Sequence, residues 1–146
     1  MDEGLPLRNP DSGLPYAEVS RRIEWSDTDA SGHHHNSVVW RLTETCEAEL
    51  FRQLGLLDDY FWSAPRVRQE VDYENKMYFG QGVTARVGVQ KVGSASMTFW
   101  FEVWGDEYQG RPKRRSASGK FVTVHVPQGT EGSTPWSDEV RKAILG

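Results

Sequence analysis

Apolar and polar residues alternate along five segments of the chain, and this alternation predicts five β-strands. In the first segment, residues 16–25, the side chains of Ala17, Val19, Ile23 and Trp25 would share one apolar face. An alternation of period two is typical of a strand that is buried on one face only. The other four strand segments are residues 65–74, 83–92, 96–104 and 116–126, and glycines or other turn residues separate them.

Between the first two strand segments the apolar period changes to about 3.6 residues, which predicts an amphipathic helix of roughly five turns. Its apolar stripe consists of Val39, Leu42, Cys46, Leu50 and Leu54, with Glu47, Glu49 and Arg52 off its centre. Asn36 and Ser37 are residue types that cap helix N-termini, and Gly55 is a common helix end. No other long helix is predicted.

One long helix among five strands indicates an α+β fold, in which an antiparallel sheet packs on a single helix. We expect a loosely ordered N-terminal arm over residues 1–15 and a single domain over residues 16–146, ending in a short docked helix after Ser137. Segment 96–104 is apolar on both faces, because Trp100 and Trp104 oppose Phe101 and its neighbours. A second subunit is the simplest cover for such a strand, so we expect a homodimer or homotetramer.

Composition narrows the class of protein. The 146 residues carry a net charge of −4, which argues against sequence-independent nucleic-acid binding, because such binding needs a basic surface. A single cysteine cannot form an intrachain disulfide. The N-terminus has no basic and apolar leader, and no segment is apolar for the length of a membrane span. We therefore expect a cytoplasmic protein that binds neither nucleic acid nor membrane.

The densest polar chemistry lies in the loop of residues 26–36, directly before the long helix. Helix N-termini present unpaired N–H groups that can stabilise an oxyanion, and an upstream carboxylate such as Asp29 could act as base or nucleophile. Asp29 could equally cap the helix or close an Asx turn. His33, His34 and His35 are adjacent and point in different directions, so we expect packing, hydrogen bonding or substrate contact, and no metal site.

The segment Trp25-Ser-Asp-Thr-Asp-Ala-Ser-Gly-His-His-His-Asn-Ser37, followed by an amphipathic helix, is similar to the signature of the 4-hydroxybenzoyl-CoA thioesterase family. The resemblance covers about residues 17–126. It includes the Lys91-Val-Gly-Ser-Ala-Ser segment and the Gly119-Lys-Phe-Val-Thr-Val strand, and the Trp136-Ser-Asp-Glu-Val-Arg tail is also similar. It implies a hotdog fold, in which a sheet wraps around one central helix, and hydrolysis of an acyl-CoA thioester without a further cofactor.

The resemblance also implies roles for particular residues. Asp29 matches the family's catalytic carboxylate, and the backbone amide of Asn36 matches the group that polarises the thioester carbonyl. Gly32 is the motif glycine. His33 would position substrate or Asp29, and Glu44, which matches an acidic position in the helix, is a further catalytic residue that the resemblance implies. Two departures stand out: relatives often have an aromatic residue where this chain has Val39, and some have a catalytic histidine in place of Asn36.

Substrate contacts are expected around this loop and at a basic rim for the phosphates of CoA. His34 and Gly32 belong to the loop, and Trp40 is a candidate for the acyl pocket, although large aromatic residues more often belong to the core or an interface. Further acyl candidates are Phe61, Trp62, Tyr78 and Phe79. The basic candidates are Lys91, Arg114 and Arg115, with Lys113 and Lys120 nearby. The basic run 113–115 could instead be a solvated turn that protects a sheet edge.

Two other functions remain open at this stage. Hotdog hydratases or dehydratases use an Asp followed five positions later by a His, and Asp29 and His34 have this spacing. Those enzymes carry Asn-Pro where this chain has Ser31-Gly32. A non-catalytic hotdog module that binds an acyl chain is the second alternative. The thiol carrier could be an acyl carrier protein in place of CoA.

Overall fold

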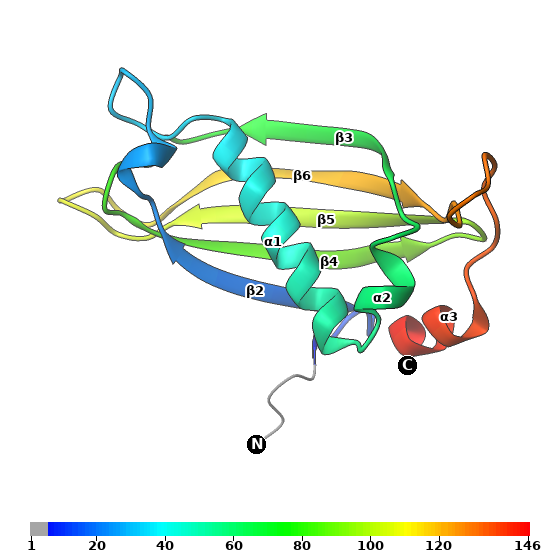
Figure 1. The fold of residues 1–146 in the computed structure, drawn as a ribbon. Coiled ribbons are helices and arrows are strands. Elements are labelled where there is room, and N and C mark those ends of the chain that lie inside the picture. Colours follow the sequence, from blue (N-terminus) through cyan, green and yellow to red (C-terminus); the bar gives the residue numbers. More distant parts are fainter. Residues whose placement is uncertain (1–5) are drawn as a thin grey trace.

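A six-stranded antiparallel sheet with one long helix lying across a single face forms the framework of the protein, in a computed structural model that describes residues 6–146 (Figure 1). The strand order across the sheet is β1-β2-β4-β5-β6-β3. The strands are β1 (Leu7–Arg8), β2 (Pro15–Arg22), β3 (Arg66–Tyr73), β4 (Gly82–Val92), β5 (Ser96–Gly105) and β6 (Arg114–Val124). The helices are α1 (Ser37–Gln53), α2 (Leu57–Tyr60) and α3 (Asp138–Leu145), with a single 3-10 turn at Trp25–Asp27. The predicted α+β hotdog architecture is confirmed, with one strand more than the expected five.

Helix α1 occupies the predicted position and buries the predicted stripe. Val39, Leu42, Cys46 and Leu50 are each at most 6% exposed against the sheet. The Cys46 thiol donates to the Ala17 carbonyl on β2 at 3.2 Å, so the helix and the edge of the sheet are joined at mid-length. This packing fixes the direction in which the N-terminus of α1 points.

The first strand segment is shorter than predicted, because β2 ends at Arg22. Glu24 and Asp27 then form a capping box around the 3-10 turn, which rotates the chain out of the strand. Trp25 is consequently 73% exposed, and its expected place on the apolar face is wrong. The turn brings the chain toward the start of α1.

The central strands β4 and β5 supply most of the core beneath α1. Alternate residues of both strands are buried, as the period-two pattern predicts. On β6, Gly119 passes so close to the Glu70 carbonyl of β3 that a Cβ atom would collide with it. Glycine is therefore required where these two strands approach.

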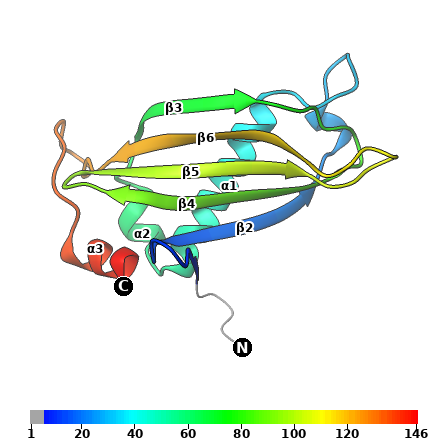
Figure 2. The ribbon, with the colours of Figure 1, turned by 180° about the vertical axis from the view of Figure 1, so that it is seen from behind.

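No helix of the described chain covers the opposite face of the sheet, which faces the viewer in Figure 2. Trp100 and Trp104 lie half-buried there, beside Tyr16 and Glu102. The expectation that a second subunit covers this face stays a prediction. Within the described residues, no helix combines the length and apolar character needed to cross a membrane.

Both ends of the described chain meet beside α3. Arg8 on β1 donates to the carbonyls of Ile144 and Ala143, at 2.7 and 3.0 Å, and Ser137 caps α3 by accepting from the Val140 amide at 3.2 Å. Part of the expected arm, residues 1–5, lies outside the described residues. The pattern did not predict β1, which is only 2 residues long.

Candidate active site

The loop before α1 folds back on itself as a tight turn. The Asp29 amide donates to the His33 carbonyl at 3.1 Å, and the Gly32 amide donates to the Asp29 carbonyl at 3.0 Å. Gly32 has φ +89°, a left-handed conformation that strongly favours glycine. The motif glycine therefore has a structural role, since it closes the turn that presents Asp29.

The carboxylate of Asp29 is held within this turn. Asp29 Oδ1 accepts from the Ser31 amide at 2.9 Å and from the Ser31 hydroxyl, so the Asx turn that the sequence allowed is present. These two hydrogen bonds lower the pKa of Asp29 below its usual range, with the hydroxyl bond the larger cause, and the group is ionised at neutral pH. The Ser31 hydroxyl also lies 3.1 Å from His33 Nδ1, which links Asp29 to His33 through one side chain.

The start of α1 leaves one backbone donor available. His35 Nδ1 accepts from the Ser37 amide at 3.2 Å and so takes the capping role that we expected of Asn36 or Ser37. The Asn36 side chain makes no capping bond. Among residues 6–146 no group accepts a hydrogen bond from the Asn36 amide. An unpaired N–H at the positive end of a helix can bind an oxyanion.

The Asp29 turn and the start of α1 line one pocket of about 410 Å³. Asp29, His33 and Asn36 belong to its loop side, together with His34 and His35. Its other wall is the end of β3 and the residues that follow, 73–76. This second wall was not predicted from the sequence, because no local pattern indicates that a strand some 40 residues away lies opposite the loop.

His34 is the buried member of the histidine run. Its Nδ1 accepts from the Met77 amide at 3.0 Å, so Nε2 carries the proton, and within the described residues Nε2 has no partner. Burial is the main cause that lowers the pKa of His34, and the imidazole is therefore neutral at neutral pH. The His34 amide also donates to the Met77 carbonyl at 2.8 Å, which anchors the loop to the segment before β4.

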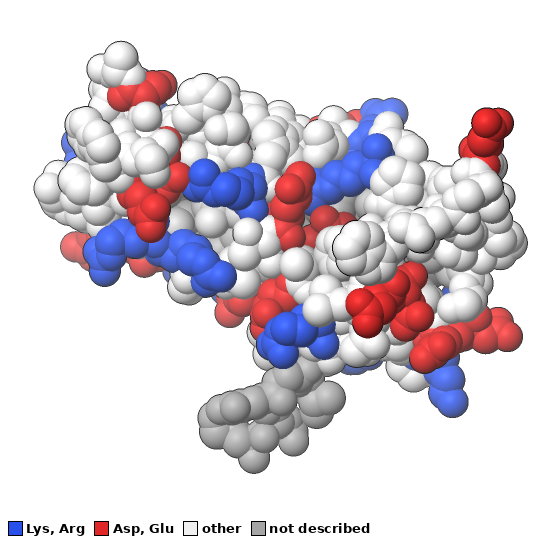
Figure 3. All heavy atoms as spheres, in the orientation of Figure 1, with Lys and Arg blue, Asp and Glu red and all other residues white. Residues whose placement is uncertain are grey.

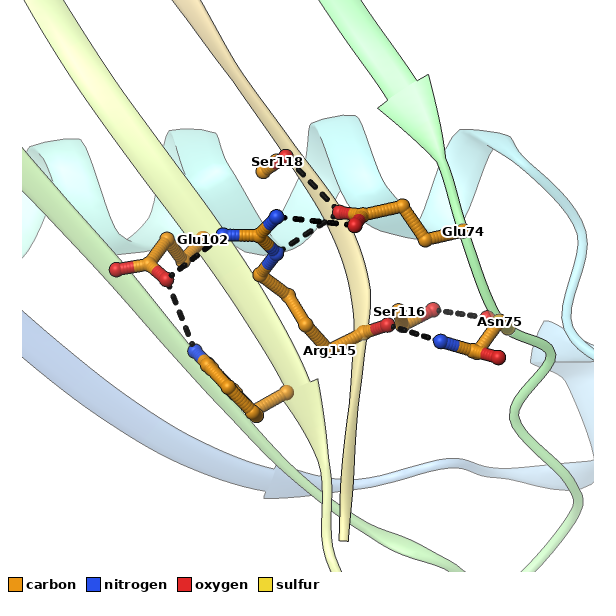
Figure 4. Close-up of polar contacts among 7 residues, drawn as sticks. Glu74, Asn75, Glu102, Arg115, Ser116 and Ser118 are labelled. Carbon is orange, nitrogen blue, oxygen red and sulfur yellow. Dashed lines mark hydrogen bonds and ion pairs between the residues drawn. The ribbon is translucent and has the colours of Figure 1, made fainter.

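The wall opposite Asp29 is held by an ion-pair network on the far face of the sheet (Figure 4). Arg115 donates to both carboxylate oxygens of Glu74, at 2.9 and 3.0 Å, and approaches Glu102 at 3.5 Å. Ser118 also donates to Glu74, at 2.9 Å, and Arg115 is the main cause that lowers the pKa of Glu74. Asn75 is fixed by its bond to the Arg115 carbonyl at 2.8 Å. Two carboxylates thus surround the Arg115 guanidinium, which braces the pocket wall.

The remaining predicted site residues lie outside this pocket. Lys91 lies near the last residues of β4, whereas the loop joins the sheet near the first residues, where the Ile23 amide donates to the Gln81 carbonyl at 2.8 Å. Arg114 is exposed at the start of β6. Trp40 lies one turn along α1 from Asn36 and donates to the Tyr73 hydroxyl at 3.1 Å. Glu44 lines a different pocket.

The first aspartate of the motif is structural. Asp27 is buried, accepts from the Glu24 amide at 2.8 Å and forms an ion pair with Arg41 of α1. Its carbonyl accepts from the His35 amide at 2.8 Å. In the described part of the chain, no three His, Cys, Asp or Glu side chains are grouped in a way that could hold a metal ion.

Comparison with known proteins identifies the family. A model of the thioesterase-like superfamily matches residues 23–144. The protein YsmA of Bacillus subtilis (strain 168), itself uncharacterized, is 24% identical over 124 residues, which are 84% of this chain and 81% of YsmA.

Two solved structures extend the comparison. A predicted thioesterase from Bacillus stearothermophilus has a TM-score of 0.76 and 30% identity, over 88% of this chain and 93% of its own. The 4-hydroxybenzoyl CoA thioesterase of Pseudomonas sp. strain CBS-3 shares the fold with a TM-score of 0.77 and 12% identity, over 88% of this chain and 98% of its own. The resemblance noted in the sequence is confirmed, and the chain belongs to the thioesterase-like superfamily as a thioester hydrolase with the hotdog fold.

Proposed function

We propose that the protein is an acyl-CoA thioesterase in which Asp29 and the Asn36 amide act on one thioester carbonyl. The observation that carries this proposal is one pocket lined by Asp29, whose carboxylate is ionised, and by Asn36, whose backbone amide has no acceptor among the described residues. The solved relatives support the choice of substrate, since one of them is by name a 4-hydroxybenzoyl CoA thioesterase.

In this mechanism the thioester oxygen accepts a hydrogen bond from the Asn36 amide. The positive end of α1 then stabilises the negative charge that develops on that oxygen as the carbonyl is attacked. Asp29 either removes a proton from an attacking water or attacks the carbonyl itself, forming an anhydride that water cleaves. Both routes consume one water and release the free acid and the CoA thiol. His33, linked to Asp29 through Ser31, would help to orient the carboxylate.

Asp29→Asn tests the role of the carboxylate. We expect thiol release from an acyl-CoA panel to fall by roughly 10²–10⁴-fold, the usual contribution of a positioned general base. Asp58→Asn, an exposed aspartate at the start of α2, is the matched control and should retain wild-type turnover. Near-wild-type turnover in a folded Asp29→Asn protein would remove Asp29 from the mechanism.

Asn36→Pro tests the backbone donor. Asn36 has φ −56°, which proline can adopt, and proline is tolerated at a helix start while removing the N–H. We expect kcat to fall by about 10²–10³-fold, as is typical when one oxyanion donor is lost. Asn36→Ala keeps the N–H and should keep most of the activity. Equal activity in the two variants would exclude the Asn36 amide as the donor.

The same assays separate the other candidate functions and carriers. Hydration of crotonyl-CoA without thiol release would indicate a hydratase, and tight acyl-CoA binding without any reaction would indicate a binding module. Faster release from acyl carrier protein than from CoA would identify the carrier protein as the natural thiol. The expected homo-oligomer is tested by light scattering of the purified protein.

A further inference from the structure

A second and larger pocket lies between α1 and β3. Its volume is about 710 Å³, compared with about 410 Å³ for the pocket at Asp29. Glu44 and Glu47 of α1 line one side, Arg66 and Gln69 of β3 line the other, and Phe61 and Ala64 contribute apolar surface. Figure 3 shows acidic and basic atoms side by side on this face of the molecule.

The pocket at Asp29 and the larger pocket are separate, and both lie beside α1 and β3. Asn36, Trp40 and Glu44 are spaced four residues apart, so they follow one flank of α1. Residues of β3 line both pockets, and Trp40, between Asn36 and Glu44 in sequence, donates to the Tyr73 hydroxyl at the end of β3. Glu44 lies eight positions after Asn36 along the helix, an axial distance of about 12 Å. An acyl group whose carbonyl sits at Asn36 and whose chain passes over the Trp40–Tyr73 contact would bring its far end toward Glu44.

Most charges in the larger pocket already have partners. The buried Glu47 carboxylate accepts from Arg66 at 2.7 Å and from the Tyr60 hydroxyl at 2.8 Å. The other Nη of Arg66 donates to Gln69 at 2.8 Å, and Arg68 pairs with Glu70. Glu44 differs from these groups, because it forms no hydrogen bond or ion pair with any described residue.

We infer that this pocket receives the distal end of the acyl group and that Glu44 selects acyl groups ending in a hydrogen-bond donor. The inference rests on the proposed thioesterase function. A terminal hydroxyl or ammonium group would donate to the Glu44 carboxylate while its methylene chain contacts Phe61 and Ala64. A terminal carboxylate would be repelled by the unpaired Glu44, because the two arginines of the pocket, Arg66 and Arg68, are already paired with carboxylates. Glu44 then recognises substrate, which replaces the catalytic role expected from the sequence.

Matched acyl-CoA substrates test this selection. We would compare kcat/KM for octanoyl-CoA with its ω-hydroxy and ω-amino analogues and with suberyl-CoA, which ends in a carboxylate. Hydrogen bonds to a charged group are worth enough to raise kcat/KM by about tenfold, and solvent at the exposed Glu44 reduces the expected gain to roughly three- to tenfold. Suberyl-CoA should be the poorest substrate of the four.

Glu44→Gln assigns the selection to the carboxylate. The kcat/KM ratio of ω-aminooctanoyl-CoA to octanoyl-CoA should fall by at least about threefold, and discrimination against suberyl-CoA should weaken. Glu49→Gln is the matched control, because Glu49 is on the same helix and pairs with Arg52 outside the pocket. Its substrate ratios should equal those of the wild type.

The substrate assays distinguish failure of the proposed thioesterase function from failure of the inference about Glu44. If no acyl-CoA of any kind is hydrolysed, the proposed function fails. If octanoyl-CoA is hydrolysed but the ω-substituents change nothing, or Glu44→Gln lowers kcat/KM equally for all four substrates, the function stands and the inference about Glu44 is overturned.

Discussion

Replacing Arg66 with methionine should destabilise the protein strongly, because it leaves the buried Glu47 carboxylate without its ion-pair partner. The Arg66 and Glu47 side chains are 15% and 5% exposed, and their ion pair measures 2.7 Å. Arg66 also lies over the Phe121 ring, with its Cζ 3.8 Å from the ring centroid. Removing one partner of a buried pair typically costs about 3–5 kcal/mol. Since Tyr60 still donates to Glu47, we expect the lower end, about 3 kcal/mol.

The free energy of unfolding that Arg66→Met loses should be larger at high pH than at low pH. Burial already raises the pKa of Glu47 above its ordinary value of 4.5, against the opposing effect of Arg66, and loss of Arg66 would raise it further. A carboxyl with a raised folded-state pKa adds stability below its unfolded pKa and loses that contribution as the pH rises through the folded value. The deficit of Arg66→Met should therefore be full at alkaline pH and shrink as the pH falls toward 4.5.

Urea unfolding followed by tryptophan fluorescence, at fixed protein concentration and several pH values, measures this deficit. In a thermal scan the same loss would lower Tm by on the order of 10 °C. Arg68→Met is the matched control on the same strand: its pair with Glu70 is 68% and 43% exposed, so its removal should cost below about 1 kcal/mol. A deficit for Arg66→Met no larger than that of the control, or one independent of pH, would refute this reasoning.

Two further predictions concern the core. Burial raises the pKa of the Cys46 thiol to about 12, so alkylation by iodoacetamide at neutral pH should proceed only as fast as the protein unfolds, and rapid labelling of the folded protein would contradict this. Gly119→Ala should lower the free energy of unfolding by about 2 kcal/mol or more, because its Cβ would collide with the Glu70 carbonyl. Gly132→Ala, which meets open space, should change it by less than about 0.5 kcal/mol, and equal effects of the two substitutions would be evidence against the collision.

The sequence predicted those parts of the fold that local periodicity determines. The apolar stripe of α1 and the alternation in β4 and β5 each report one buried face, and the structure buries those faces. The same patterns failed where local geometry or a distant partner overrides them. Trp25 fits an apolar strand position, yet the capping box at Glu24 ends the strand direction there, and the Trp25 side chain lies exposed to solvent.

In the candidate site, too, the features set by local sequence could be predicted and those set by distant partners could not. Asp29 and Asn36 could be proposed from one short loop and the helix after it. The opposing wall from Tyr73 onward could not, because it depends on β3 pairing with β6 at the edge of the sheet. Glu47 lies off the centre of the helical stripe and would be judged solvent-facing, but Arg66 and Tyr60, distant in sequence, provide the partners that permit its burial.

The bonds from Arg8 to the last turn of α3 have a consequence for synthesis on the ribosome. Arg8 and Ile144 are 136 positions apart, so β1 emerges long before the carbonyls that hold its side chain exist. Until α3 leaves the exit tunnel, the Gly13 carbonyl is the one partner of the Arg8 guanidinium within residues 6–146 that has already emerged. We therefore expect the hydrogen bonds from Arg8 to α3 to form among the last events of folding. Nascent chains stalled before α3 should expose the hairpin of β1 and β2 to proteases.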